Sequence, residues 1–89
     1  MMTYRVSPEI SYRSVYDEVV ILDVKGDRYL GLNQSGAVVW ETLAQGGSPT
    51  DAVDALVTRF GIDRDRSRSD VDALIADLVK NGLLEVAAG

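Results

Sequence analysis

Residues 27–40 read DRYLGLNQSGAVVW, and within this stretch the pattern changes from that of a strand to that of a helix. Arg28–Leu32 follows a glycine–aspartate pair, which is a hairpin signal because glycine tolerates the positive φ of tight turns. From about Gln34 to Gln45, apolar residues recur at helical spacing. Asn33 or Ser35 can cap this helix by offering a side-chain oxygen to free backbone N–H groups. We therefore expect a strand that leads directly into a helix.

The residues before this junction favour strands. Residues 10–33 are rich in β-branched and aromatic side chains, which fit a pleated surface. Three antiparallel strands are expected, at about Glu9–Ser14, Glu18–Val24 and Arg28–Leu32. If their order in space follows the sequence, the third strand lies at an edge of the sheet.

The loop between the second and third strands decides which side chains face the core. A three-residue loop, Lys25–Asp27, pairs Val24 with Arg28 and places four aliphatic residues on one face: Val20, Leu22, Leu30 and Leu32. It leaves Asp23 in water, on the other face with Ile21, Tyr29 and Gly31. A two-residue loop, Gly26–Asp27, would instead place Asp23 on the same face as Leu30. We therefore favour the three-residue loop.

Two further helices are expected downstream. The first begins at Ser48–Pro49, with Ser48 as the cap and proline at the first helical position, and it ends at Gly61. The second follows a loop at Ile62–Ser67, is capped by Ser67 or Ser69, and ends at Asn81–Gly82. Its apolar stripe consists of Val71, Leu74, Ile75, Leu78 and Val79.

A chain of 89 residues has the length of one domain. We divide residues 1–89 into an extended N-terminal segment (1–8), a sheet (10–33) and a three-helix part (34–85). The expected fold is α+β, with a small three-stranded antiparallel sheet followed by three helices. The same description fits a winged helix-turn-helix.

The amino-acid composition excludes most catalytic mechanisms and metal sites. Without cysteine or histidine the chain has no thiolate nucleophile, no imidazole base and no usual zinc ligand. Asp63, Asp65 and Asp70 lack the longer acidic ladder of a calcium loop. Asp70 and Asp77 lie one heptad apart on the last helix, too far for an acid–base pair, and we interpret them as surface charges. We expect no enzyme activity, no cofactor and no metal.

The charge and hydropathy of the chain also bear on its partners. The net charge is −5, whereas nucleic-acid binding usually needs a basic patch. The clustered arginines, Arg59, Arg64, Arg66 and Arg68, are interleaved with aspartates, which is typical of a solvated loop. Residues 1–8 lack the apolar core of a signal peptide, and no apolar run could span a membrane. We expect a cytoplasmic protein with neither nucleic acid nor membrane as a partner.

What remains is the surface beside the third strand. An edge strand exposes N–H and C=O groups with which another chain can pair. Gly31 allows close approach of another backbone. The last helix has a wide apolar stripe, so an apolar groove between it and the third strand would accept an extended peptide. A closed core without such a groove is the alternative from the residues alone.

The ordered combination of motifs resembles the PqqD-like family. In that family an aromatic–x–x–Leu–Asn segment, here Tyr29 to Asn33, leads into a small-residue turn and a helix with a tryptophan, here Trp40. The resemblance covers residues 10–85. The other segments that carry it are Leu43, Gly46–Gly47, Phe60–Asp63, Asp70–Val71, Leu74–Ile75, Leu78 and Gly82–Leu84.

The resemblance implies a winged-helix-like domain that binds the leader segment of a ribosomally made precursor peptide. The leader would add as an antiparallel strand on Arg28, Tyr29, Leu30, Gly31 and Leu32. Tyr29 would be a rim contact and Trp40 a core residue. The groove wall would consist of Val71, Leu74, Ile75 and Leu78.

The resemblance also implies a maturation enzyme as a partner. We favour the leader peptidase and cyclase of lasso peptide biosynthesis, because the segment Tyr4–Pro8 resembles that type. The alternative is a peptide chaperone for a radical-SAM enzyme, as in quinone-cofactor biosynthesis. From the residues, a winged-helix nucleic-acid binder and a dimerisation module that uses the same edge strand remain competing hypotheses.

Overall fold

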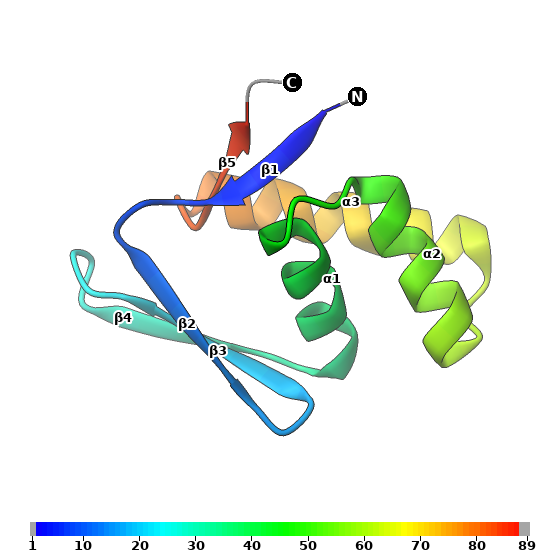
Figure 1. Cartoon of the computed structure of the whole chain (residues 1–89), viewed down its shortest axis with the longest axis horizontal. Helices are drawn as coiled ribbons and strands as arrows, with labels where there is room; N and C mark the ends of the chain where they lie inside the picture. The colour runs from blue at the N-terminus through cyan, green and yellow to red at the C-terminus, as the bar shows by residue number, and fades with distance from the viewer. Residues whose placement is uncertain (1, 88–89) are drawn as a thin grey trace.

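The computed structural model describes residues 2–87, so residues 1, 88 and 89 of the expected single unit lie outside it. Figure 1 shows a sheet, three helices and a separate strand pair. The elements in chain order are β1 (Thr3–Val6), β2 (Ile10–Val15), β3 (Glu18–Asp23), β4 (Arg28–Leu32), α1 (Gln34–Ala44), α2 (Pro49–Phe60), α3 (Arg64–Lys80) and β5 (Leu84–Ala87). The predicted α+β fold, a three-stranded antiparallel sheet followed by three helices, is confirmed.

The hairpin between β3 and β4 has a longer loop than we expected. Asp23 pairs with Arg28, so four residues form the loop instead of three. The Asp23 carboxylate accepts hydrogen bonds from the Gly26 N–H and from Arg28 Nε, each at 2.9 Å. Asp27 takes up the positive φ of the turn (51°). The prediction that Asp23 lies in water on the outer face is therefore wrong: it shares the inner face with Ile21 and Leu30, and its side chain is 13% exposed. The hydrogen bonds to its own turn stabilise the carboxylate there.

The one-residue difference in register inverts β3 relative to the prediction. Val19 and Ile21 face the helices and are 0% and 1% exposed, whereas Val20 and Leu22 lie on the outer face. The prediction that Val20 and Leu22 belong to the core is therefore wrong. The β4 half of the prediction is right, because Leu30 pairs with Ile21 and Leu32 with Val19 on the inner face.

The helix caps match the sequence signals at two of three helices. The Asn33 side chain accepts from the Gly36 N–H at 3.0 Å and begins α1. Ser48 and Asp51 form a reciprocal capping box at the start of α2. At α3 the prediction is wrong: Asp63 is the cap, and the helix begins at Arg64. Ser67 and Ser69, the predicted caps, lie inside the helix, and the buried Ser67 hydroxyl donates to the Ile62 carbonyl at 3.5 Å.

The ends of the described chain form a second, two-stranded sheet. β1 pairs antiparallel with β5, from Thr3 opposite Ala87 to Val6 opposite Leu84. The expected extended segment 1–8 is thus partly a strand, and residues after α3 form its partner. The side chains of Arg5 and Glu85 form an ion pair of 2.6 Å between the two strands. These strands are far apart in the sequence, and no local pattern indicates such a pairing.

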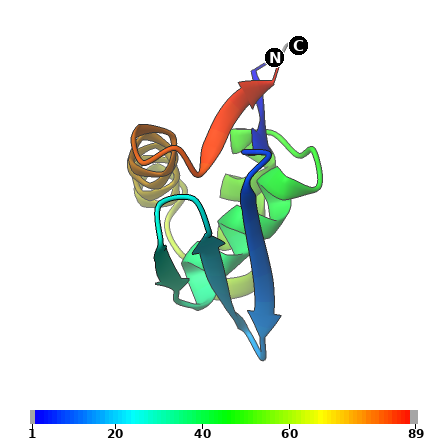
Figure 2. The same cartoon turned by 90° about the vertical axis from the view of Figure 1, so that its left-hand side faces the viewer.

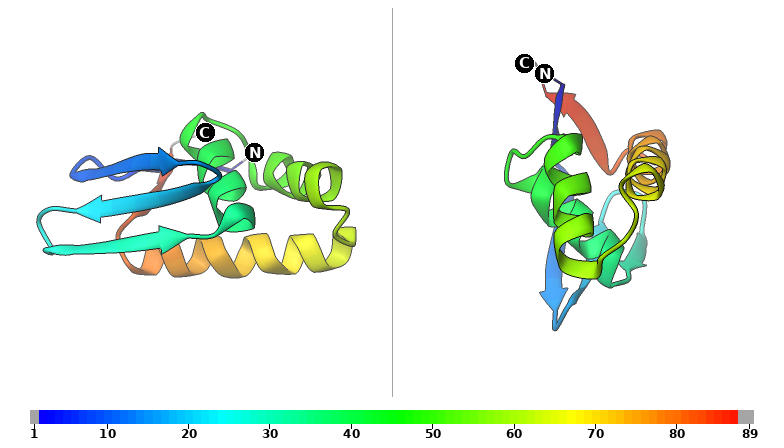
Figure 3. Two further views of the ribbon diagram at one scale, coloured as in Figure 1. Left: turned by 90° about the horizontal axis from the view of Figure 1, so that it is seen from below. Right: turned by 90° about the vertical axis from the view of Figure 1, so that its right-hand side faces the viewer.

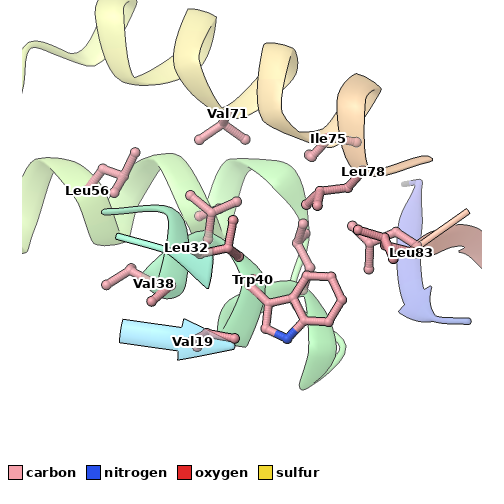
Figure 4. Packing of buried hydrophobic residues seen from close by; sticks show 14 of the residues in the cluster. Val19, Leu32, Val38, Trp40, Leu56, Val71, Ile75, Leu78 and Leu83 are labelled. Atoms are coloured by element: carbon pink, nitrogen blue, oxygen red, sulfur yellow. The ribbon is translucent and has the colours of Figure 1, made fainter. Parts of the chain in front are cut away.

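The hydrophobic core lies between the sheet and the three helices, where α1 packs against β3 and α2, and α2 packs against α3. Figure 4 shows Val71, Ile75 and Leu78 pointing from α3 toward Leu32 and Trp40. Trp40 is fully buried, and the Tyr12 ring contacts it edge-on with centroids 5.4 Å apart. The prediction that Trp40 is a core residue is confirmed. Among residues 2–87, no helix combines the length and the apolar character needed to cross a membrane.

Candidate functional site

β4 is the last strand of the sheet, as predicted. The strand order is β2–β3–β4, so β4 is paired on one side only. Figure 2 shows β4 on the side of the sheet that is nearer to α3, and the left view of Figure 3 shows α3 running beside it. The free edge therefore presents backbone N–H and C=O groups next to a helix.

Two pockets lie between this edge and α3. The first, here called the Leu83 pocket, has a volume of about 160 Å³. Its apolar lining comes from Ile21, Leu30 and Leu83, and its polar lining from Asp23, Arg28, Asp77 and Asn81, with Tyr29 at β4. It lies where β4 begins and α3 ends.

The second pocket, here called the Leu74 pocket, has a volume of about 400 Å³ and lies where β4 ends. Its apolar lining includes Leu32, Val39, Leu56, Ile62 and Leu74. Gly31 and Asp70 also line it. Since Leu30 lines one pocket and Gly31 the other, the two pockets follow one another along the strand, and together they are called the groove here.

Arg28 connects the two walls of this groove. Its Nη2 donates to the backbone carbonyl of Asn81, at the end of α3, at 2.7 Å. Its Nε donates to Asp23 at 2.9 Å. The Gly26 N–H, and after it the Arg28 guanidinium, hold the pKa of Asp23 below its ordinary value. Arg28 thus ties the start of β4 to the end of α3, and the two elements run in opposite directions.

The structure brings six of the nine predicted site residues to the groove. Arg28, Tyr29 and Leu30 line the Leu83 pocket, and Gly31, Leu32 and Leu74 line the Leu74 pocket. Tyr29 is 77% exposed on the outer face of the sheet. Gly31 pairs with Val20 and faces the same outer side, and a Cβ placed on it would meet no atom within 4 Å, so the outer face is open at this position.

The other three predicted residues belong to the core. Val71, Ile75 and Leu78 are 0%, 6% and 1% exposed, and neither pocket includes them. Their side chains are part of the hydrophobic core cluster. A contact between these three residues and a peptide stays a prediction.

Sequence reasoning predicted one of the residues with which α3 faces the groove, Leu74, and missed the other three, Asp70, Asp77 and Asn81. Asp70, Leu74, Asp77 and Asn81 follow one another at spacings of four, three and four, which places them on one stripe of the helix. The heptad spacing of Asp70 and Asp77 was visible in the sequence. It did not reveal the groove, because only the docking of α3 decides which of two adjacent stripes is covered.

Three of the four clustered arginines form local ion pairs. Arg64 contacts Asp54 at 2.6 Å, and Arg66 and Arg68 lie about one helical turn from Asp70 and Asp72, at 3.9 and 4.0 Å. These arginines lie in the first turns of α3 and not in a loop, which corrects that detail of the prediction. Within residues 2–87 no group of three or more acidic side chains is placed to hold a metal.

Comparisons with known proteins agree with this geometry. The model of the family of coenzyme PQQ synthesis protein D (PqqD) matches residues 18–84, which include β3, β4 and all three helices. A solved structure of TbiB1 in complex with the TbiA(beta) leader peptide has 29% identity and a TM-score of 0.86, over 96% of this chain and 99% of that chain.

A lasso peptide synthetase B1 complexed with the leader peptide has 30% identity and a TM-score of 0.84, over 92% of this chain and 96% of that chain. Comparison with curated protein sequences finds no match. The family match covers most of the chain, and the structural matches extend over nearly all of it. The predicted resemblance is thus confirmed, and the chain belongs to the PqqD family.

Proposed function

We propose that this chain binds the leader segment of a ribosomally made precursor peptide and delivers it to a maturation enzyme. The observation that carries the proposal is the free edge of β4 beside an apolar groove. The two solved structures to which the chain is similar contain a leader peptide, which supports the same role here. Recruitment, not catalysis, is the proposed activity, and its place is the cytoplasm, where ribosomes make the precursor.

The binding mode is strand addition. A leader that pairs antiparallel with Arg28–Leu32 runs from the Leu74 pocket toward the Leu83 pocket, hence in the same direction as α3. Its backbone would supply hydrogen bonds to the open edge, and every second side chain would point toward α3. Side chains at those positions would enter the two pockets and supply most of the specificity.

Two pathways compete for the maturation enzyme. The two structural matches support a leader peptidase and cyclase of lasso peptide biosynthesis, which we favour. The family description supports a peptide chaperone for a radical-SAM enzyme of quinone-cofactor biosynthesis. Calorimetry of the peptide-loaded chain with a leader peptidase and with a radical-SAM enzyme from its gene neighbourhood separates them, because only the true partner binds.

A nuclear magnetic resonance titration tests the leader-binding role. The probes are synthetic N-terminal halves of the short peptides encoded beside the gene. We expect the amide signals of residues 28–32 to shift and to gain protection from exchange, while those of residues 10–15, on the other edge strand, stay unchanged. Shifts confined to β2, or to the arginine-containing first turns of α3 with DNA as the ligand, would overturn the proposal.

A further inference from the structure

The groove-facing stripe of α3 carries two carboxylates that strand addition would cover. Asp70 lines the Leu74 pocket, and Asp77 lines the Leu83 pocket. No ion pair within residues 2–87 involves Asp77, whose carboxylate accepts a long hydrogen bond from Asn81 Nδ2 at 3.5 Å. Asp70 has only a distant partner, Arg66 at 3.9 Å, and both side chains are mostly exposed to water. Neither carboxylate is therefore firmly neutralised in the free protein.

The other charged groups that line the groove do not neutralise the carboxylates of Asp70 and Asp77. The guanidinium in the Leu83 pocket, Arg28, is already bound to Asp23 and to the Asn81 carbonyl. That pocket thus holds two carboxylates and one cation. The Leu74 pocket is lined by one carboxylate and by no lysine or arginine. Each pocket is therefore lined by apolar side chains and carries a net negative charge.

A peptide laid along β4 would remove water from Asp70 and Asp77. An ionised carboxylate that loses water without gaining a partner opposes binding. Lysine and arginine suit such a pocket, because their aliphatic stems pack on the apolar lining while the cationic head reaches the carboxylate. The charge of the groove therefore selects among peptides that could equally well form the added strand.

Spacing determines where these cations must lie. Seven residues of helix separate the two carboxylates by about 10.5 Å along α3. Side chains on one face of a strand recur about every 6.8 Å, so positions four residues apart lie about 13.6 Å from each other. Lysine and arginine side chains are long and flexible enough to bridge the difference of about 3 Å between these two spacings. The peptide position midway between the two basic residues faces Leu74.

We propose that the bound peptide carries a lysine or arginine opposite Asp70, an apolar residue two positions later opposite Leu74, and a second lysine or arginine two positions after that, opposite Asp77. The proposal rests on the proposed function, since it describes the ligand of the same groove. It makes Asp70 and Asp77 specificity-determining residues. The order follows from the common direction of the added strand and α3.

A displayed library of random twelve-residue peptides, selected on the full chain, tests the proposal. We expect the selected peptides to carry the basic–x–apolar–x–basic pattern and to shift the amides of residues 28–32. D70N and D77N should each weaken binding about threefold, and the double variant about tenfold. D72N, which neutralises an α3 carboxylate outside both pockets, should leave the affinity unchanged. Raising NaCl from 50 to 500 mM should bring the wild-type affinity close to that of the double variant.

The two hypotheses fail in different ways. Peptides that shift residues 28–32 but show no basic preference, and that bind D70N/D77N as tightly as wild type, would overturn this inference and leave the proposed function standing. Selection of tyrosine or uncharged hydrogen-bond donors at the two positions would overturn it equally. If no selected peptide perturbs β4, the proposed function is wrong and the inference fails with it.

Discussion

β3 and β4 are neighbours in one sheet, and they differ in what surrounds them. β3 is paired on both sides and contacts α1, so its inward residues Val19 and Ile21 are almost completely buried. β4 is paired on one side. Of its two inward leucines, Leu32 is 8% exposed, whereas Leu30 is 42% exposed although it lies directly opposite Ile21. The strand with the missing neighbour keeps apolar surface at the Leu83 pocket. Within one sheet, β3 thus contributes mainly to the stability of the core, whereas β4 has an exposed edge and apolar surface to which a peptide could bind.

Truncation of the facing pair Ile21 and Leu30 gives the largest expected effect. Ile21→Ala should lower the free energy of unfolding by about 2–5 kcal/mol, because it leaves a cavity in the closed core. Leu30→Ala should cost about 1 kcal/mol or less, because solvent already reaches the side chain. Urea denaturation measures both. Equal losses would show that β4 is as closed as β3.

Charge in the groove gives the next effect, on binding instead of stability. Leu30→Arg and Leu74→Arg should each weaken binding of a β4-binding peptide by about 30-fold, the loss typical of an anchor residue, or about 2 kcal/mol. Val79→Arg is the matched control, because Val79 is a half-exposed apolar residue of α3 outside both pockets. Calorimetry measures the peptide affinity of those variants whose circular dichroism spectra show the native fold. An unchanged affinity for folded Leu74→Arg would place the peptide elsewhere.

The β4–α1 junction and the start of α2 could be predicted from local sequence. The junction of β4 and α1 was predictable because a hairpin signal, the Asn33 cap and a helical repeat agree within a few residues. The capping residues of α2 were predictable for the same reason. Local signals that reinforce one another determine local structure, and the edge position of β4 followed from them.

The groove wall was not predictable in the same way. The choice between the 71/75/78 stripe and the 70/74/77 stripe depends on the rotation of α3 against α1 and β4, which is a matter of packing. The β3 register depended on two hydrogen bonds to Asp23 that no apolar pattern reports. The β1–β5 pair joins segments from the two ends of the chain, and neither has a partner signal nearby.

Arg28 offers a smaller test of how the two walls are held together. Arg28→Gln should lower the free energy of unfolding by about 1 kcal/mol, since it removes charged hydrogen bonds to Asp23 and the Asn81 carbonyl from a half-exposed side chain. Arg64→Gln should cost less than about 0.5 kcal/mol, because it breaks one exposed pair with Asp54. Urea denaturation compares the two. Equal losses would mean that Arg28 does not connect β4 to α3.

The smallest effect expected is the acid dependence contributed by Asp23. Its pKa is lowered in the folded chain, mainly by the Gly26 N–H and then by Arg28, so the folded state favours the charged carboxylate. The associated stability is fully present above the unfolded-state value of about 3.8 and is lost as the pH falls through the lower folded-state value. Asp23→Asn should therefore lower the melting temperature at pH 7 and flatten its decline below pH 4, whereas Asp72→Asn should not. A parallel acid decline in wild type and Asp23→Asn would show that this turn, and with it the start of β4, does not depend on the ionised carboxylate.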